Sequence, residues 1–121
     1  MRFKIANHLV KNVAKQSKFV DVCGNYLLLS NHFPNISVLN FEELLSNDLS
    51  QYDYILIDNL LQNVSAEKAN RLLNEIVDKD ILCMVKVHNS EIAVVEKMNL
   101  NLTICFKNDL FSYFVNYEYN D

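Results

Sequence analysis

The stretch YDYILIDN (residues 52–59), followed by a helical pattern that begins after Ser65, decides the fold class of this chain. Residues 52–57 are rich in aromatic and β-branched residues and end at two polar residues, which predicts a short buried strand. Ser65 is a favourable N-cap, and the apolar spacing after it predicts a helix that continues to Val77. A strand followed by a helix that packs back on it is the repeating unit of an α/β sheet.

The same alternation extends in both directions along the chain. Before this unit, the sequence predicts a helix over residues 3–16, a strand over 19–22, a short helix over 26–33, a strand over 36–41 and a brief helix over 42–49. After it, the apolar run ILCMVKV (81–87) predicts a strand covered on both faces, and Ser90 is expected to cap a helix that contains Ile92, Val95 and Met98. Strands over 102–106 and 111–119 have only four residues between them, so they predict an antiparallel hairpin. We therefore expect a single open, three-layer α/β domain over residues 1–121, mostly parallel.

Composition limits the possible locations and chemistry. Half of the 121 residues are apolar, which is enough for one hydrophobic core. Cys23, Cys83 and Cys105 are widely spaced and form no CxxC pair, so we expect buried free thiols and no metal site. No apolar run reaches the ~20 residues of a membrane span, and the N-terminus is too polar for a signal peptide. These features predict a soluble, cytoplasmic protein without a membrane partner.

The charge of the chain is unevenly distributed. The net charge is −4, but residues 1–18 carry +5 and residues 19–121 carry −9. Because an acidic body repels nucleic acid, contact with nucleic acid is expected only through the basic N-terminal helix. The basic face of that helix is either a solvated surface or a docking surface for an acidic partner. The aromatic segment FSYFVNYEY (111–119) predicts a homodimer surface if it lies near a sheet edge.

Three segments carry a family resemblance: FVDVCGNYLLL (19–29), YDYILIDNLLQNVSAEKANRLLNEI (52–76) and ILCMVKV (81–87). In this order they resemble the first strand and glycine-rich loop, the fourth strand with its helix, and the strand before the terminal hairpin of class I S-adenosylmethionine-dependent methyltransferases. The resemblance implies a Rossmann-like sheet that binds S-adenosylmethionine beyond the carboxyl ends of its strands.

The chain also departs from the pattern of that family. Only Gly24 remains of the glycines that allow close approach of the backbone to a cofactor. Asn40 ends the second predicted strand where the family has an acidic residue, with Glu42 and Glu43 just after it. Only about ten residues separate the strands at 36–41 and 52–57, so one βα unit is expected to be missing. These departures predict a shortened and degenerate member of the family.

Ligands of open α/β sheets bind where the strands end. The polar residues expected at this edge are Asp21, Gly24, Asn25, Asn40, Glu42, Asp58, Asn59, His88 and Asn89. The candidate cofactor-binding residues among them are Asp21, Gly24, Asn25, Glu42, Asp58 and Asn59, and the candidate catalytic residues are Asp58 and His88.

Several of these residues have a second interpretation. Asp58 and Asn59 either face the cofactor and the group to be methylated or cap a turn. His88 is either a general base or a solvated loop residue. Asp21 is expected to order the loop through the amides of Gly24 and Asn25, since a charge inside a strand needs partners. His8 and His32 are expected at the surface.

Three functions follow from these patterns. The first is a methyltransferase-like domain that has lost catalysis and serves in binding or assembly. The second is a minimal active methyltransferase. The third is a receiver-like signalling domain with Asp58 as phosphoryl acceptor, because YILID resembles the central strand of receivers, although Asp21 lacks the acidic neighbour that a receiver needs. Hydrolase and nucleoside-triphosphatase motifs are absent from the sequence.

Overall fold

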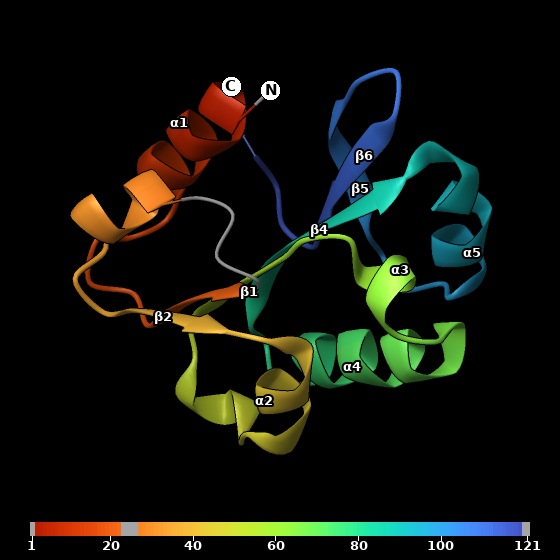
Figure 1. The fold of residues 1–121 in the computed structure, drawn as a ribbon, viewed down its shortest axis with the longest axis horizontal. Coiled ribbons are helices and arrows are strands. Elements are labelled where there is room, and N and C mark those ends of the chain that lie inside the picture. Colours follow the sequence, from red (N-terminus) through yellow and green to blue (C-terminus); the bar gives the residue numbers. More distant parts are fainter. Residues whose placement is uncertain (1, 23–26, 120–121) are drawn as a thin grey trace.

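Six strands of the described chain form one sheet in the order β2-β1-β3-β4-β6-β5 (Figure 1). The computed structural model describes residues 2–22 and 27–119. The strands are β1 (Phe19–Val22), β2 (Ile36–Leu39), β3 (Tyr54–Ile57), β4 (Leu82–His88), β5 (Thr103–Lys107) and β6 (Phe111–Val115). Strands β1 to β4 are parallel, whereas β6 is antiparallel to both β4 and β5. This confirms the predicted mostly parallel sheet with an antiparallel C-terminal hairpin.

Helices cover both faces of the sheet (Figure 1). The α-helices are α1 (Arg2–Asn12), α2 (Phe41–Ser46), α3 (Leu60–Asn63), α4 (Ala66–Asp78) and α5 (Ile92–Lys97), and the 3₁₀ turns are η1 (Leu27–Asn31), η2 (Leu49–Gln51) and η3 (Asn89–Glu91). Helix α1 and turn η1 pack on one face, and α2, α4 and α5 pack on the other. Residues 40–53 between β2 and β3 contain only α2 and η2, as the missing βα unit requires. None of the helices in the described part of the chain has the length and apolarity that crossing a membrane would require.

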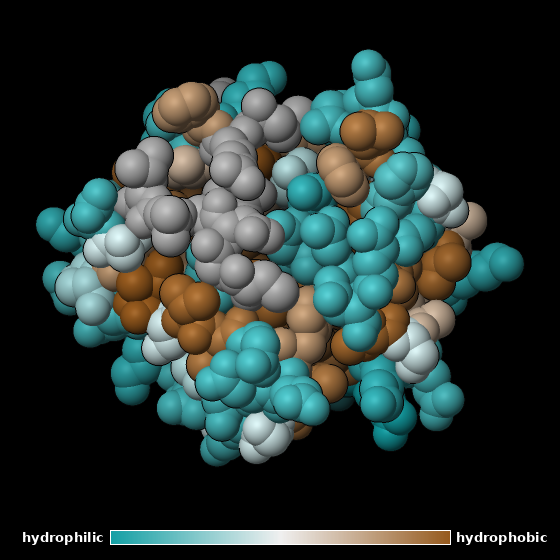
Figure 2. Space-filling view, in the orientation of Figure 1, coloured by the Kyte–Doolittle hydropathy of each residue, from teal (hydrophilic) through white to brown (hydrophobic). Residues whose placement is uncertain are grey.

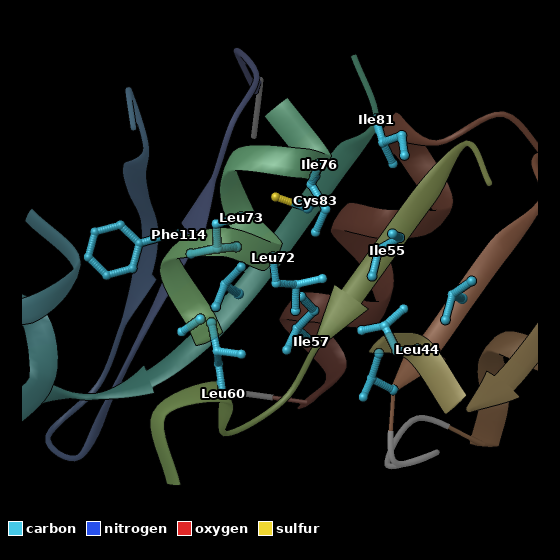
Figure 3. Close-up of a cluster of buried hydrophobic side chains, with 14 of the residues drawn as sticks. Leu44, Ile55, Ile57, Leu60, Leu72, Leu73, Ile76, Ile81, Cys83 and Phe114 are labelled. Carbon is cyan, nitrogen blue, oxygen red and sulfur yellow. The ribbon is translucent and has the colours of Figure 1, made fainter. Parts of the chain in front are cut away.

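The alternation of side chains along the strands creates two apolar cores. In β3, Tyr54 and Leu56 belong to the core under α1, whereas Ile55 and Ile57 belong to the core under α2 and α4. Figure 3 shows the second core, where Ile57 lies among side chains from the sheet and from α4. Each such side chain contributes roughly 1.5–3 kcal/mol when it is fully buried. The central strands are therefore held from both faces, as the apolar run at 81–87 predicted.

The predicted first helix is too long. The helix of the structure ends at Asn12 rather than at residue 16, and Val10 and Ala14, whose helical spacing with Ile5 and Leu9 predicts burial, are exposed. The Asn12 amide donates to the carbonyl oxygen of His8 at 2.8 Å.

Other boundaries also differ from prediction. Within residues 26–33 the described part forms the 3₁₀ turn η1, not an α-helix, and the last strand ends at Val115 instead of Tyr119. Ser90 does not cap α5, because residues 89–91 form η3, which is capped by His88. Strand β6 lies between β4 and β5, so the aromatic C-terminal strand does not form a sheet edge.

Two further differences from the predictions concern the burial of His8 and of Cys105. His8 was expected at the surface but is only 3% exposed, because it packs under the C-terminal segment. Cys83 is buried as predicted, whereas Cys105 is partly exposed. The predictions for Cys23, Gly24 and Asn25 lie outside the described residues.

Candidate functional site

The carboxyl ends of β1, β3 and β4 bring three charged side chains to one face of the sheet. Asp21 lies opposite Leu56 in the β1–β3 register, and Leu56 in turn lies opposite Met84 of β4. The neighbours of Asp21 and of Lys86 in their strands point into the core under α2 and α4, so both of these side chains point to the other face. Asp21 is 1% exposed and Asp58 is 4% exposed. Two carboxylates are therefore buried at the edge where the sequence predicted a site.

A lysine that the sequence reasoning did not single out neutralises one of these carboxylates. Nζ of Lys86 lies 3.2 Å from Oδ1 of Asp58, and the side chains are 16% and 5% exposed. The same ammonium lies 4.0 Å from the ring centroid of Phe111, in cation–π geometry. A lone charge inside the apolar run at 81–87 was the signal that could have revealed this pair.

His88 has a structural role at the end of β4. Its Nδ1 accepts a hydrogen bond from the backbone N–H of Ser90 at 3.1 Å, while its own backbone N–H donates to Oε1 of Glu91 at 2.8 Å. This reciprocal pair is a capping box. The imidazole also meets the ring of Phe111 edge to face, with centroids 5.8 Å apart. The lone pair that a general base would use is therefore already accepting a hydrogen bond.

Asn40 forms a second capping box, at the end of β2. The backbone N–H of Glu43 donates to Oδ1 of Asn40 at 2.8 Å, and the N–H of Asn40 donates to Oε1 of Glu43 at 3.1 Å. The two side chains thereby satisfy backbone N–H groups at the start of α2. Glu42 lies exposed in the same turn. Asn40 therefore serves as a helix cap, and Glu42 is the nearby exposed carboxylate.

Asn59 and Asn89 follow β3 and β4 and differ in their contacts. Asn59 adopts a left-handed conformation with φ of 53°, which asparagine tolerates well, and precedes α3 without capping it through its side chain. Its Oδ1 is buried and accepts no hydrogen bond from any described residue. Asn89, in contrast, accepts from the hydroxyl of Ser112 at 2.6 Å and donates to the carbonyl of Asn108 at 2.9 Å. Asn89 therefore anchors the hairpin, whereas the buried oxygen of Asn59 has no donor among the described residues.

The structure thus gathers Asp21, Asp58 and Asn59 at the expected edge. Asn40, His88 and Asn89 lie at strand ends too, but their side chains hold local structure. Among residues 2–22 and 27–119, no group of three or more histidine, cysteine or acidic side chains is arranged to hold a metal ion.

Comparison with solved structures identifies the type of fold. The chain superposes on magnesium protoporphyrin IX methyltransferase from Synechocystis PCC 6803, which was solved with bound SAM, with a TM-score of 0.60, 12% identity and coverage of 94% of this chain and 76% of that one. It is equally similar to an N-methyltransferase from Bradyrhizobium japonicum in complex with S-adenosyl-L-homocysteine, with a TM-score of 0.61, 12% identity and coverage of 97% and 86%.

A third neighbour is a protein of the NADB-Rossmann superfamily from Streptococcus agalactiae, with a TM-score of 0.53, 16% identity and coverage of 93% and 66%. No protein-family model matches the chain, and no curated protein matches it in sequence. The chain therefore has the methyltransferase-like form of the Rossmann fold, as the sequence resemblance predicted.

Proposed function

We propose that this chain is a methyltransferase-like domain that has lost catalysis and acts as a binding or assembly module. The observation that carries the proposal is the ion pair between Lys86 and Asp58, at 3.2 Å, on the edge where such folds bind ligands. A ligand group that needs Asp58 would have to displace the ammonium of Lys86. Displacement is costly because both side chains are largely buried.

The charge of the cofactor strengthens this argument. S-adenosylmethionine carries a positive sulfonium, which an unneutralised carboxylate would favour and a nearby ammonium opposes. Lys86 places such an ammonium beside Asp58. The side chains of Asn40 and His88 are further candidates that the capping boxes occupy, because their acceptor atoms already accept hydrogen bonds from backbone N–H groups. The scarcity of glycine near residue 24 supports the same conclusion.

The test is a thermal-shift and calorimetric titration with S-adenosylmethionine and S-adenosylhomocysteine. A ligand at 1 mM with a Kd of about 100 μM would stabilise the fold by about 1.4 kcal/mol, which raises the Tm of a domain of this size by about 5 °C. We expect no shift up to millimolar concentrations of either ligand. A shift of that size, with a calorimetric Kd below about 100 μM, would refute the loss of cofactor binding.

One observation favours a minimal active methyltransferase as the second candidate. The buried Oδ1 of Asn59 accepts no hydrogen bond from the described residues, and an orphaned buried acceptor costs about 1–3 kcal/mol. A cofactor amine or hydroxyl would relieve this cost, and Asp21 and Asp58 lie on the neighbouring strands. In this case Asn59→Gly, which removes the amide and tolerates the left-handed backbone, should abolish the ligand-induced shift with little change in the Tm of the free protein.

The receiver-like alternative is tested in parallel. A receiver would be stabilised by beryllofluoride with Mg²⁺, and Asp58→Asn would abolish that stabilisation. We expect no effect, because the acceptor carboxylate is paired with Lys86 and the sheet ends in an antiparallel hairpin instead of a fifth parallel strand.

The surface of the domain gives less information about how it would bind a partner. The larger exposed apolar side chains are spread over several elements: Phe3, Val10, Val38, Leu45, Leu82, Val94 and Leu110. On the face drawn in Figure 2, apolar residues form small separate patches among hydrophilic ones. This distribution supports recognition through polar or charged groups more than through one broad apolar interface. The proposed homodimer is tested by light scattering after size-exclusion chromatography.

A further inference from the structure

A basic cleft lies between helix α1 and strand β5, and it shares no residue with the candidate site at the strand ends. The cleft has a volume of about 400 Å³. Its walls include Lys4, Asn7, His8 and Lys11 from α1, together with Phe106 and Lys107 from β5. The spacing of the four helical residues places them on one face of α1. Residues nearly one hundred positions apart in sequence thus form one concave surface.

The floor of this cleft is fixed by hydrogen bonds. Nδ2 of Asn12 donates to the carbonyl oxygen of His8 at 2.8 Å and lies 3.2 Å from its Nδ1. Since a carbonyl can only accept, this side-chain atom is the amide nitrogen, so Nδ1 is an acceptor and the ring proton is on Nε2. Nε2 lies 2.8 Å from the hydroxyl of Tyr117, to which it donates. The ring of Phe106 meets the imidazole edge to face at 5.4 Å.

The hydrogen bonds to Asn12 and Tyr117 hold the His8 ring in place at the floor of the cleft. The network continues to the buried hydroxyl of Tyr54, 2.6 Å from that of Tyr117. Because the floor is tied to the core in this way, the floor itself needs little ordering when a ligand binds.

The lysines are the charged side chains among the described lining residues of the cleft. Lys4, Lys11 and Lys107 are exposed at its rim, and no acidic residue is among its described lining residues. This is unexpected in a chain whose net charge is −4. Lysine ammonium groups bind phosphate as point charges, and three of them suit a dianion better than a monovalent carboxylate. The volume lies within the range of ordinary small-molecule sites, about 300–1,000 Å³.

We propose that this cleft binds a small phosphate monoester, with the phosphate held by Lys4, Lys11 and Lys107. Asn7 supplies an amide for a further hydrogen bond, and the organic part of the ligand lies along the wall formed by α1 and β5. A long nucleic acid fits less well, because residues 19–121 carry a net charge of −9 and would repel the rest of a polyanion. A small anion meets only the local positive field.

The experiment is a calorimetric and NMR titration at low ionic strength with adenosine 5′-monophosphate, ribose 5-phosphate and inorganic phosphate, and with adenosine as the uncharged probe. We expect Kd values below about 1 mM for the phosphorylated probes and no binding of adenosine. Equal affinities would assign the cleft to the phosphate group alone, and tighter binding of the nucleotide would assign it to nucleotides. Both results support the proposal.

Charge-reversal variants locate the site. Lys11→Glu and Lys107→Glu come from different elements, and each should weaken binding about tenfold or more. Lys15→Glu is the matched control, because it makes the same change of charge just after α1 but does not line the cleft. An equal loss in this control would overturn the proposal, as would binding of a single-stranded oligonucleotide without binding of the monophosphate, or no binding of any phosphorylated probe at about 5 mM. None of these results depends on binding of S-adenosylmethionine.

Discussion

The buried ion pair at the strand ends gives the sharpest test of the structure. At 3.2 Å, the attraction between Lys86 and Asp58 is about 5 kcal/mol at an effective dielectric constant of about 20. Desolvation of the two charges offsets most of this attraction, so the pair adds little net stability. Removing one partner is different, because the other charge then stays buried without compensation.

The two single substitutions should therefore have unequal effects. Lys86→Met leaves Asp58 charged at 4% exposure and should lower the free energy of unfolding by about 3 kcal/mol. Asp58→Asn leaves a lysine that is 16% exposed, can reach water and still contacts Phe111, so we expect a loss of about 1–2 kcal/mol. The double variant has neither charge and should resemble the milder single variant, which corresponds to a coupling energy of about 3 kcal/mol.

Urea unfolding followed by circular dichroism measures these differences at constant m value. Lys79→Met is the matched control, because its partner Glu75 lies 3.8 Å away and both side chains are at least 35% exposed. Such a pair should contribute less than about 1 kcal/mol. The reasoning is refuted if Lys86→Met costs no more than Lys79→Met, or if the double variant loses the sum of the two single losses.

Three further predictions concern buried and capping groups. Burial raises the pKa of the Cys83 thiol from 9.0 to about 12, so the native protein should leave this thiol unlabelled by a thiol reagent at pH 8 until it unfolds, whereas the partly exposed Cys105 reacts first. Burial also raises the pKa of Tyr54 well above 10.0, so Tyr54 keeps its proton in the native state while it ionises in the unfolded state, and the free energy of unfolding should fall as pH rises above about 10. Tyr54→Phe should reduce the slope of the free energy of unfolding against pH, measured by urea titration, by up to about 1.4 kcal/mol per pH unit. An unchanged slope would contradict the assignment. Asn40→Ala removes the cap of α2 and should cost about 1 kcal/mol, measured by the same unfolding assay, with a cost near zero arguing against the capping box.

Much of the fold could be predicted because it depends on local patterns. Ser65 caps α4 by accepting from the backbone N–H of Lys68 at 3.2 Å, and α4 matches its predicted range to within one residue at its end. The short connection before β6 predicted the hairpin correctly. The end of α1 at Asn12 is not visible in the sequence pattern, because apolar residues continue at helical spacing to Val13 and Ala14.

The candidate site was less predictable, since the partners of its residues come from distant parts of the chain. The sequence places Asp58 at a strand end, but only the register of β3 and β4 brings Lys86 beside it. In the same way, His8 looked like a surface residue because its partner Tyr117 is 109 positions away. The sequence shows which strands end in polar residues, but it does not show which side chains from other strands pair with these residues.

Lys86 also explains how this edge could remain stable without a ligand. Two carboxylates, Asp21 and Asp58, are buried on one face of adjacent strands, and such a pair needs a positive counter-charge. If the domain binds no cationic cofactor, as proposed, the counter-charge has to come from the chain itself. The ammonium of Lys86, which contacts Asp58 and lies over the ring of Phe111, supplies it. The same residue would therefore stabilise the empty edge and oppose the cofactor, so the proposed loss of binding and the retention of the fold would both follow from one side chain.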